Sequence, residues 1–346
     1  MEGVWRRRLL TLGVALGGLG VALGSGLPLP FLFGPMLACL VAALLGAPLQ
    51  GWGTVTDAAR TVLGVAVGAS VTPALLAQLP SMALSLAIVP IYVGVIGLVG
   101  VPFFRRLCGF DLPTAFFAAM PGGAQDMVLF GKEAGGDVRA LSLIHATRIA
   151  VIVTCAPILL SHVYGASLSR PLGAAAASLP LPEMAMMAMA ALVGWKAGER
   201  VGLFGAAILG PMILTLMLSL GGFIHARPPR EALQAAQFLI GTGIGVHYVG
   251  VTWRELSRIV GIGALFMVIL AVLAGAVAEA VVLLGLAAPV EAFLAFAPGG
   301  QAEMTVLAIV AGAELGFVVV HHLARIILVI LGAPLVLGWL RRWDRK

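Results

Sequence analysis

The chain carries one short motif twice, and this repetition constrains the fold more than any other feature of the sequence. Pro121–Met127 (PGGAQDM) returns as Pro298–Met304 (PGGQAEM), at an offset of 177 residues (298 − 121 = 177). Proline removes a backbone donor and paired glycines permit unusual φ values, so each copy is expected to end a helix. Each copy also places an amide and a carboxylate within an apolar stretch. Lipid tolerates neither broken backbone nor charge, so the two copies predict a buried polar site.

The composition places these motifs in a membrane protein. Of the 346 residues, 61% are hydrophobic and 10% are charged, whereas a soluble domain carries roughly 25% charged residues. The apolar residues form continuous runs that are long enough to cross about 30 Å of hydrocarbon as helices. The alternating segments of a membrane β-barrel are absent from the sequence. We therefore expect an all-α polytopic membrane protein.

The repetition extends well beyond the motif. Gly34–Leu37 (GPML) corresponds to Gly210–Ile213 (GPMI), at an offset of 176 residues. At the offset of 177, the matching pairs are Gly64 and Gly241, Gly68 and Gly245, Asp137 and Glu314, His145 and His322, Arg148 and Arg325, and Pro157 and Pro334. So many matches in one register indicate an internal duplication, with a first membrane repeat over 1–176 and a second over 177–346. The Gly-rich third apolar run of each repeat is expected to be a kinked or partly unwound helix.

The charges of the loops bear on whether the two repeats are inverted or parallel. Loop 105–111 carries Arg105 and Arg106, whereas its counterpart near 285–291 has no basic residue. Opposite basicity in equivalent loops indicates opposite sides of the membrane, which favours inverted repeats. Inversion requires an odd number of crossings, hence about five transmembrane helices plus a broken or re-entrant helix in each repeat. The basic loop 221–234 disagrees, and a parallel arrangement of six plus six helices stays open.

Basic residues at both ends of the chain predict where the termini lie. Arg6–Arg8 precede the first apolar run, and Arg341, Arg342, Arg345 and Lys346 follow the last. By the positive-inside rule, both termini are expected in the cytoplasm. The first segment also resembles a signal peptide, but the repeat requires it as the first membrane helix. The net charge of +6 therefore reports topology, and no nucleic-acid partner is expected.

A second polar pair follows each motif by about 20 residues. His145 and Arg148, like His322 and Arg325, lie three residues apart and share one helix face. A buried arginine in a helix bundle requires a carboxylate partner or an anionic ligand. The acids of the motifs and those that open the same helices are the candidate partners. The alternatives are a structural lock between arginine and carboxylate and an anion-binding or proton-linked pair.

These residues together predict a transport site between the two motifs. The candidate substrate- or ion-binding residues are Pro121, Gly122, Gly123, Gln125, Asp126, His145, Arg148, Pro298, Gly299, Gly300, Gln301, Glu303, His322 and Arg325. Free amides at the start of a half-helix favour anions, whereas the two carboxylates favour a cation or a proton. We therefore expect a secondary transporter of a small anionic or zwitterionic solute, coupled to protons or sodium ions.

No catalytic or metal site is expected. The adjacent His321 and His322 point about 100° apart on a helix, so they make a poor chelate, and the three cysteines show no CxxC spacing. No nucleotide-binding motif is present, so we expect neither an enzyme nor a cofactor. The expected partners are the lipid bilayer, a small solute, a proton or sodium ion, and a second copy of the chain in a homodimer.

Both motif blocks resemble those of a known bacterial family. Met120–Arg148 and Ala297–Arg325 resemble the duplicated segments of AbrB-type integral membrane proteins, and the resemblance covers essentially the whole chain. It implies a multi-pass protein of the bacterial cytoplasmic (inner) membrane. More distantly, the duplicated halves with broken helices are similar to cation/proton antiporters and bile-acid symporters. That likeness implies secondary transport at the level of the fold.

The AbrB-type family carries two functional labels, ammonia monooxygenase and regulator of gene expression. A monooxygenase requires a redox metal, and the residues offer no ligand set for one. A regulator that binds DNA directly requires an exposed reading element, and the loops are too short to supply it. A membrane sensor that alters gene expression indirectly stays an alternative to the transporter.

Overall fold

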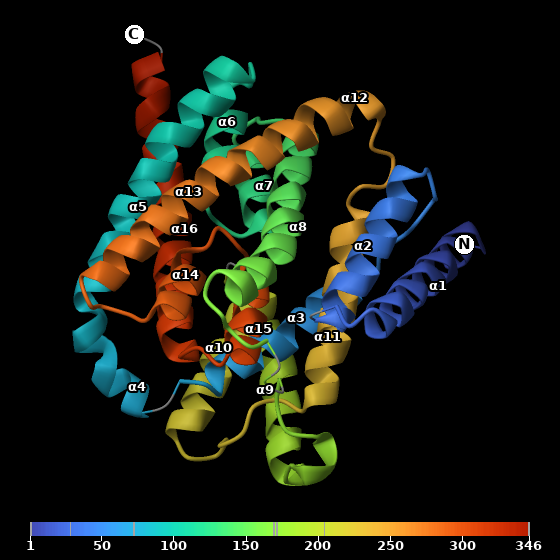
Figure 1. Cartoon of the computed structure of the whole chain (residues 1–346), viewed down its shortest axis with the longest axis vertical. Helices are drawn as coiled ribbons and strands as arrows, with labels where there is room; N and C mark the ends of the chain where they lie inside the picture. Colours follow the sequence, from blue (N-terminus) through green and yellow to red (C-terminus); the bar gives the residue numbers. More distant parts are fainter. Residues whose placement is uncertain are drawn as a thin grey trace. The chain divides into compact units, whose positions relative to one another are not determined.

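The structure is a computed structural model that describes residues 2–27, 29–71, 73–168, 170, 172–203 and 205–344. Within these residues every regular element is helical and no strand occurs, so the all-α class is confirmed (Figure 1). Five helical segments are long and apolar enough to cross a membrane: Gly3–Gly24, Leu79–Leu107, Val138–His162, Trp253–Leu283 and Leu315–Arg342. The inverted orientation of the repeats and the side on which the termini lie stay predictions, and Arg345 and Lys346 fall outside the described residues.

The helices follow one another with short connections. In chain order they are α1 (Glu2–Gly24), α2 (Pro30–Leu44), α3 (Gly53–Gly68), α4 (Pro73–Gln78), η1 (Leu79–Met82), α5 (Ala83–Pro102), η2 (Phe103–Leu107), α6 (Leu112–Ala119), α7 (Ala124–Glu133), α8 (Val138–His162), η3 (Ala176–Ser178), α9 (Leu181–Arg200), α10 (Ala206–Leu220), α11 (Arg230–Val246), α12 (Trp253–Glu255), η4 (Leu256–Val260), α13 (Gly261–Leu283), α14 (Pro289–Phe296), α15 (Gln301–Ala311) and α16 (Leu315–Asp344).

The chain divides into two compact units, and each takes segments from both halves of the sequence. Unit 1 comprises Met1–Ala77, Ser167–Thr252 and Ile309–Gly312. Unit 2 comprises Gln78–Ala166, Trp253–Ala308 and Ala313–Lys346. This division differs from the predicted repeats at 1–176 and 177–346, which describe the duplication of the sequence and stay a prediction.

In unit 1, the Gly-rich third helix of each half is one continuous α-helix rather than an unwound segment. Its glycines permit close packing instead. A Cβ added at Gly64 of α3 would lie 2.4 Å from the carbonyl oxygen of Ile208 in α10, and one at Gly241 of α11 would lie 2.3 Å from that of Leu32 in α2. Only glycine allows two backbones this close. The third helix of each half therefore packs against the second helix of the other half.

The first two helices of each half meet in the same way. A Cβ added at Gly18 of α1 would lie 2.3 Å from the carbonyl oxygen of Gly34 in α2. In the second half, a Cβ at Gly194 of α9 would lie 2.6 Å from the carbonyl oxygen of Gly210 in α10. Helices in lipid gain no hydrophobic free energy from association, so such close contacts supply much of their attraction.

Unit 2 contains the helices that the two motifs interrupt. The chain leaves the helical conformation between α6 and α7 at the first motif, and between α14 and α15 at the second. The helix breaks predicted from Pro-Gly-Gly are therefore present in both copies. The long helices α5, α8, α13 and α16 pack with α6, α7 and α14, and the last residues of α15 belong to unit 1.

Candidate functional site

Every buried charged side chain that the structure describes lies in unit 2. These side chains are Arg148 of α8, Glu303 of α15 and Arg325 of α16, which are 4%, 8% and 3% exposed. The equivalent histidines, His145 and His322, are buried beside the arginines. Charge held at membrane depth costs roughly 2.5–3.5 kcal/mol or more for each residue. Its concentration in one unit marks the polar centre of the molecule.

The pair on α8 holds the first broken helix by its carbonyl groups. Nε2 of His145 lies 3.0 Å from the carbonyl oxygen of Phe117. Arg148 donates from Nη1 to the carbonyl oxygen of Met120 (3.1 Å) and from Nη2 to that of Gly122 (2.6 Å). The carbonyls at the end of a helix have no partner within it, and a cation there is favoured by the helix dipole. The arginine therefore stabilises the break itself.

The pair on α16 repeats this geometry in the second half. Nε2 of His322 lies 2.9 Å from the carbonyl oxygen of Leu294. Arg325 donates from Nη1 to the carbonyl oxygen of Ala297 (2.8 Å) and from Nη2 to that of Gly299 (2.8 Å). Both partners of each bond lie 177 residues after their counterparts in the first half. We call each His-Arg pair with its carbonyls a carbonyl clamp.

From the sequence, a carboxylate partner or an anionic ligand is expected for these arginines, and the structure adds backbone carbonyls as partners of both. The acids that open the same helices have other roles. Oδ1 of Asp137 accepts from the backbone amides of Arg139 (2.9 Å) and Ala140 (3.0 Å), so Asp137 caps α8. Glu314 is exposed, and its amide donates to Oε1 of Glu291 (3.2 Å). A broken helix supplies its own acceptors, and the arginines use those.

The amide and the acid of the second motif are described, and both are buried. Gln301 and Glu303 lie in the first turn of α15. The carboxylate folds back toward the start of the helix, because a Cβ at Gly300 would lie 2.2 Å from Oε2 of Glu303. The positive end of the helix dipole favours a carboxylate at this place. The side chains of Gln125 and Asp126 in the first motif lie outside the described residues.

The two clamps belong to one electrostatic centre. Arg148 lies close enough to Arg325 and Glu303 to interact with both electrostatically. The hydroxyl of Tyr92 donates to the carbonyl oxygen of Phe296 (2.9 Å). Among the described residues, the buried Nε of each arginine has no hydrogen-bond partner. Each clamp thus keeps one charged donor that a ligand or water can use.

The first glycine of each motif lies in close contact with the methionine of the same motif. None of the four motif glycines adopts a positive φ, although the helix ends at both motifs as predicted. A Cβ at Gly122 would lie 2.6 Å from Cε of Met127, and one at Gly299 would lie 2.6 Å from Cε of Met304. Both methionines are fully buried, so each motif packs its own methionine against its first glycine. The prolines before these glycines, Pro121 and Pro298, are buried as well.

Sequence reasoning missed the polar residues of α5. Tyr92 contacts the second broken helix, and Oγ of Ser85 lies 2.9 Å from Nε2 of His321. A tyrosine and a serine inside an apolar helix were the available signal. His321 also contacts the carbonyl oxygen of Phe317 through Nδ1 (2.8 Å), so it and its neighbour on α16 face different partners. Within the described part of the chain, no group of three or more His, Cys, Asp or Glu could hold a metal ion.

Comparison with known proteins identifies relatives across nearly the whole chain. The family described as "Transition state regulatory protein AbrB" matches residues 31–341. YhjN of Bacillus subtilis (strain 168) is 24% identical over 292 residues, which cover 80% of this chain and 76% of that protein. "Putative regulator AbrB" of Escherichia coli (strain K12) is 24% identical over 343 residues, which cover 98% and 96%. No solved structure matches the chain.

Proposed function

The chain belongs to the AbrB family, and from this premise we propose that it is a secondary transporter of a small anionic or zwitterionic solute. The solute binds in unit 2, between the two broken helices. The observation that carries the proposal is the pair of carbonyl clamps, because a buried arginine fixed on a broken helix recurs at equivalent positions. Broken helices that present their ends to a polar centre are the typical substrate sites of secondary transporters. The proposal makes the protein a carrier and not an enzyme.

Positive charge supports a carboxylate or another anionic group as the part of the solute that is recognised. Arg148 and Arg325 each donate two hydrogen bonds to backbone carbonyls. Nε of each arginine has no hydrogen-bond partner among the described residues, so it can donate to a ligand. An arginine held this firmly loses little entropy when it binds a ligand, and guanidinium N–H groups pair well with carboxylates.

The acidic residue of the second motif supports coupling to a cation. Glu303 is buried, and Arg148 is the cation that interacts with it electrostatically. A carboxylate kept at membrane depth pairs with a base or binds a cation or a proton. Moving one charge across a potential of 100 mV yields about 2.3 kcal/mol, which supports a concentration gradient of more than tenfold. We propose protons or sodium ions as the coupling ion.

The five apolar helical segments support a place in the bacterial inner membrane. The basic ends of the chain favour cytoplasmic termini by the positive-inside rule. Inverted repeats and a homodimer belong to the same proposal, because duplicated transporters with broken helices commonly have inverted halves.

A thermal-shift screen of small carboxylates and amino acids tests whether the site binds a solute. A ligand at one hundred times its dissociation constant stabilises the folded protein by about 2.7 kcal/mol, which raises the melting temperature measurably. We expect Glu303→Gln or Asp126→Asn to abolish or reduce that shift, and the exposed Glu133→Gln to leave it unchanged. A hit must then be taken up by proteoliposomes under a proton or sodium gradient. Tight binding without uptake would contradict a transporter.

The family is described as a regulatory protein and the Escherichia coli relative as a regulator, which supports a second candidate function. In this case the protein would sense a solute through the same site and pass the signal to a cytoplasmic partner. The two functions are distinguished in a strain that lacks the native protein and expresses a variant that binds the solute but does not transport it. If changes in gene expression are restored by a variant that binds solute but does not move it, the regulator is favoured.

A further inference from the structure

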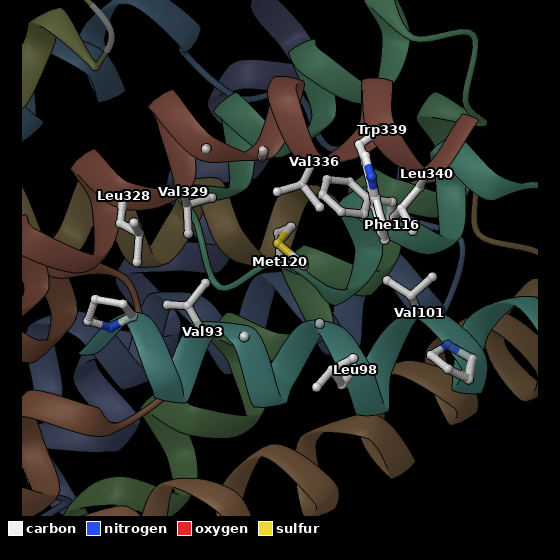
Figure 2. Close-up of a pocket in the computed structure, with 16 residues that line it drawn as sticks. Val93, Leu98, Val101, Phe116, Met120, Leu328, Val329, Val336, Trp339 and Leu340 are labelled. Atoms are coloured by element: carbon white, nitrogen blue, oxygen red, sulfur yellow. The ribbon is translucent and has the colours of Figure 1, made fainter. Parts of the chain in front are cut away.

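Unit 2 contains an apolar groove that the proposed function does not use. It is a cavity of about 480 Å³ between α5 and α16, and Phe116 and Met120 form part of its wall. Figure 2 shows the two long helices along its sides, with Leu328 near one end and Trp339 near the other. Apart from the indole nitrogen of Trp339, the lining side chains are apolar. The groove therefore suits a hydrocarbon ligand.

The length of the groove corresponds to one leaflet of a bilayer. Along α5 it extends from Pro90 to Pro102, which is roughly 18 Å at 1.5 Å per residue. Half of the hydrocarbon core of a bilayer is about 15 Å thick. Glycines keep the groove open, because a Cβ added at Gly94 or Gly332 would meet no atom within 4 Å.

Positive charge gathers at one end of the groove. Figure 2 places Val101 and Leu340 at the end where Trp339 lies. Arg105–Arg106 follow Val101 in η2, and Arg341–Arg342 follow Leu340 in α16. At the opposite end, the first turns of α5 carry no charged residue, and Arg325, one turn before Leu328 in α16, is buried with its guanidinium bonded to the carbonyl oxygens of Ala297 and Gly299. The groove thus has an apolar body and one cationic end, which is the charge pattern complementary to an anionic phospholipid.

We propose that this groove binds an acyl chain of an anionic phospholipid, whose phosphate lies at the arginines of η2 and the end of α16. Basic residues between transmembrane helices bind anionic headgroups, and guanidinium groups pair with phosphate. Tryptophan is enriched at the level of the headgroups, where Trp339 would lie. This site is separate from the solute site, and the proposal does not require the protein to be a transporter.

The groove adjoins the first broken helix, so a lipid bound there is expected to stabilise the folded protein. Met120 lines the groove with its side chain and accepts a hydrogen bond from Arg148 with its carbonyl oxygen. A Cβ at Gly97 would lie 3.2 Å from Cε of Met120, so this side chain is in close contact with α5. A bound acyl chain therefore packs against the residue that precedes Pro121, and we expect it to raise the melting temperature.

Phosphatidylglycerol and phosphatidylcholine with identical acyl chains test the proposal on the purified full-length protein in detergent. Native mass spectrometry counts the retained lipid, and thermal unfolding measures its effect. We expect the wild type to retain phosphatidylglycerol in preference to phosphatidylcholine, with a higher melting temperature. Gly94→Leu with Gly332→Leu fills the groove without a backbone clash and should lower retention roughly tenfold. Gly275→Leu on α13, where a Cβ also meets no atom within 4 Å, is the matched control.

The headgroup end is tested separately. Arg106→Gln with Arg342→Gln removes two exposed charges and should weaken the preference for phosphatidylglycerol roughly tenfold, with little loss of phosphatidylcholine. Arg6→Gln with Arg7→Gln removes two exposed charges of unit 1 and should leave the preference unchanged. Equal preference in these two double variants would place the phosphate elsewhere and overturn the assignment.

Two further outcomes would overturn the acyl-chain site. One is equal lipid retention by the groove-filled variant and Gly275→Leu. The other is a wild-type dimer that becomes monomeric in the groove-filled variant while lipid retention stays constant, which would assign the groove to a second copy of the chain. If the filled variant fails to fold, brominated phosphatidylglycerol at an equimolar ratio provides the second measurement. Its quenching of tryptophan fluorescence should fall in Trp339→Phe, and quenching that persists there would contradict the proposal.

Discussion

Unit 1 and unit 2 draw on the same two halves of the sequence, yet they bury different chemistry. The buried polar side chains that the structure describes in unit 1 are all uncharged, namely those of Thr11, Thr61, Thr215, Gln237 and Thr242. Unit 2 buries two arginines, a glutamate and three histidines within the described residues. Unit 1 is held by glycines at close helix crossings, whereas unit 2 is held by side chains that bind the ends of broken helices.

The difference shows two ways of building a helical protein without a hydrophobic driving force. Continuous helices satisfy their own backbone groups, so they associate through close packing, and glycine serves them best. A broken helix leaves carbonyls that need donors, and a buried arginine supplies several at once. The second solution costs more, because the charge must be desolvated. Its presence in unit 2 is the reason for placing the solute there.

The largest expected effect comes from opening a carbonyl clamp. Arg325→Met leaves the carbonyl oxygens of Ala297 and Gly299 without their donors, at roughly 1–3 kcal/mol each. We expect a loss of about 2–5 kcal/mol of stability, measured as the melting temperature in detergent. Arg200→Met, at an exposed position of α9, should cost less than about 0.5 kcal/mol. Equal losses in the two variants would mean that the clamp does not stabilise unit 2.

A smaller effect is expected where the glycine crossings of unit 1 are overpacked. Gly64→Ala or Gly241→Ala places a methyl group against a backbone carbonyl, which cannot move as a flexible side chain does. The expected cost is about 1–3 kcal/mol in thermal unfolding. Gly17→Ala on α1 meets no atom within 4 Å and should be neutral or stabilising by up to about 1 kcal/mol. If Gly64→Ala behaves like Gly17→Ala, close packing is not what holds unit 1.

The smallest effect concerns the acid that caps α8. Asp137→Ala removes two hydrogen bonds to backbone amides and should cost about 1 kcal/mol. Asp111→Ala is the matched control, because Asp111 occupies the N-cap position of α6 without a side-chain hydrogen bond. Its cost should be only a few tenths of a kcal/mol. If Asp137→Ala costs no more than Asp111→Ala, the side chain of Asp137 does not stabilise α8 as a cap.

The sequence predicted the elements of unit 2 better than their contacts. The repeat and the helix breaks could be read directly, because proline and glycine act on the local backbone. The partners of Arg148 and Arg325 could not, because a sequence displays side chains and not the carbonyls that a break sets free. The roles of Gly64 and Gly241 were misjudged for a related reason. A glycine that loosens a helix and a glycine that allows a close helix crossing cannot be told apart until the neighbouring helix is known.

The interleaving of the two halves also lay beyond the sequence. A duplicated pattern shows which residues are equivalent, but it does not show which copy a helix packs against. Gly241 of α11 contacts Leu32 of the first half, although both could have packed within their own repeat. Tyr92 gave a detectable signal as a polar residue in an apolar helix. Its acceptor on the second broken helix required the fold.

The most direct test of the central claim is gradient-driven uptake by proteoliposomes of a solute that binds the wild type. Glu303→Gln removes the charge of the buried acid in unit 2, and Glu133→Gln removes an exposed one from the same unit. We predict that wild type and Glu133→Gln accumulate the solute under a proton or sodium gradient, and that Glu303→Gln does not, although it folds normally. Accumulation at the wild-type rate by folded Glu303→Gln would contradict the assignment of coupled transport to this site.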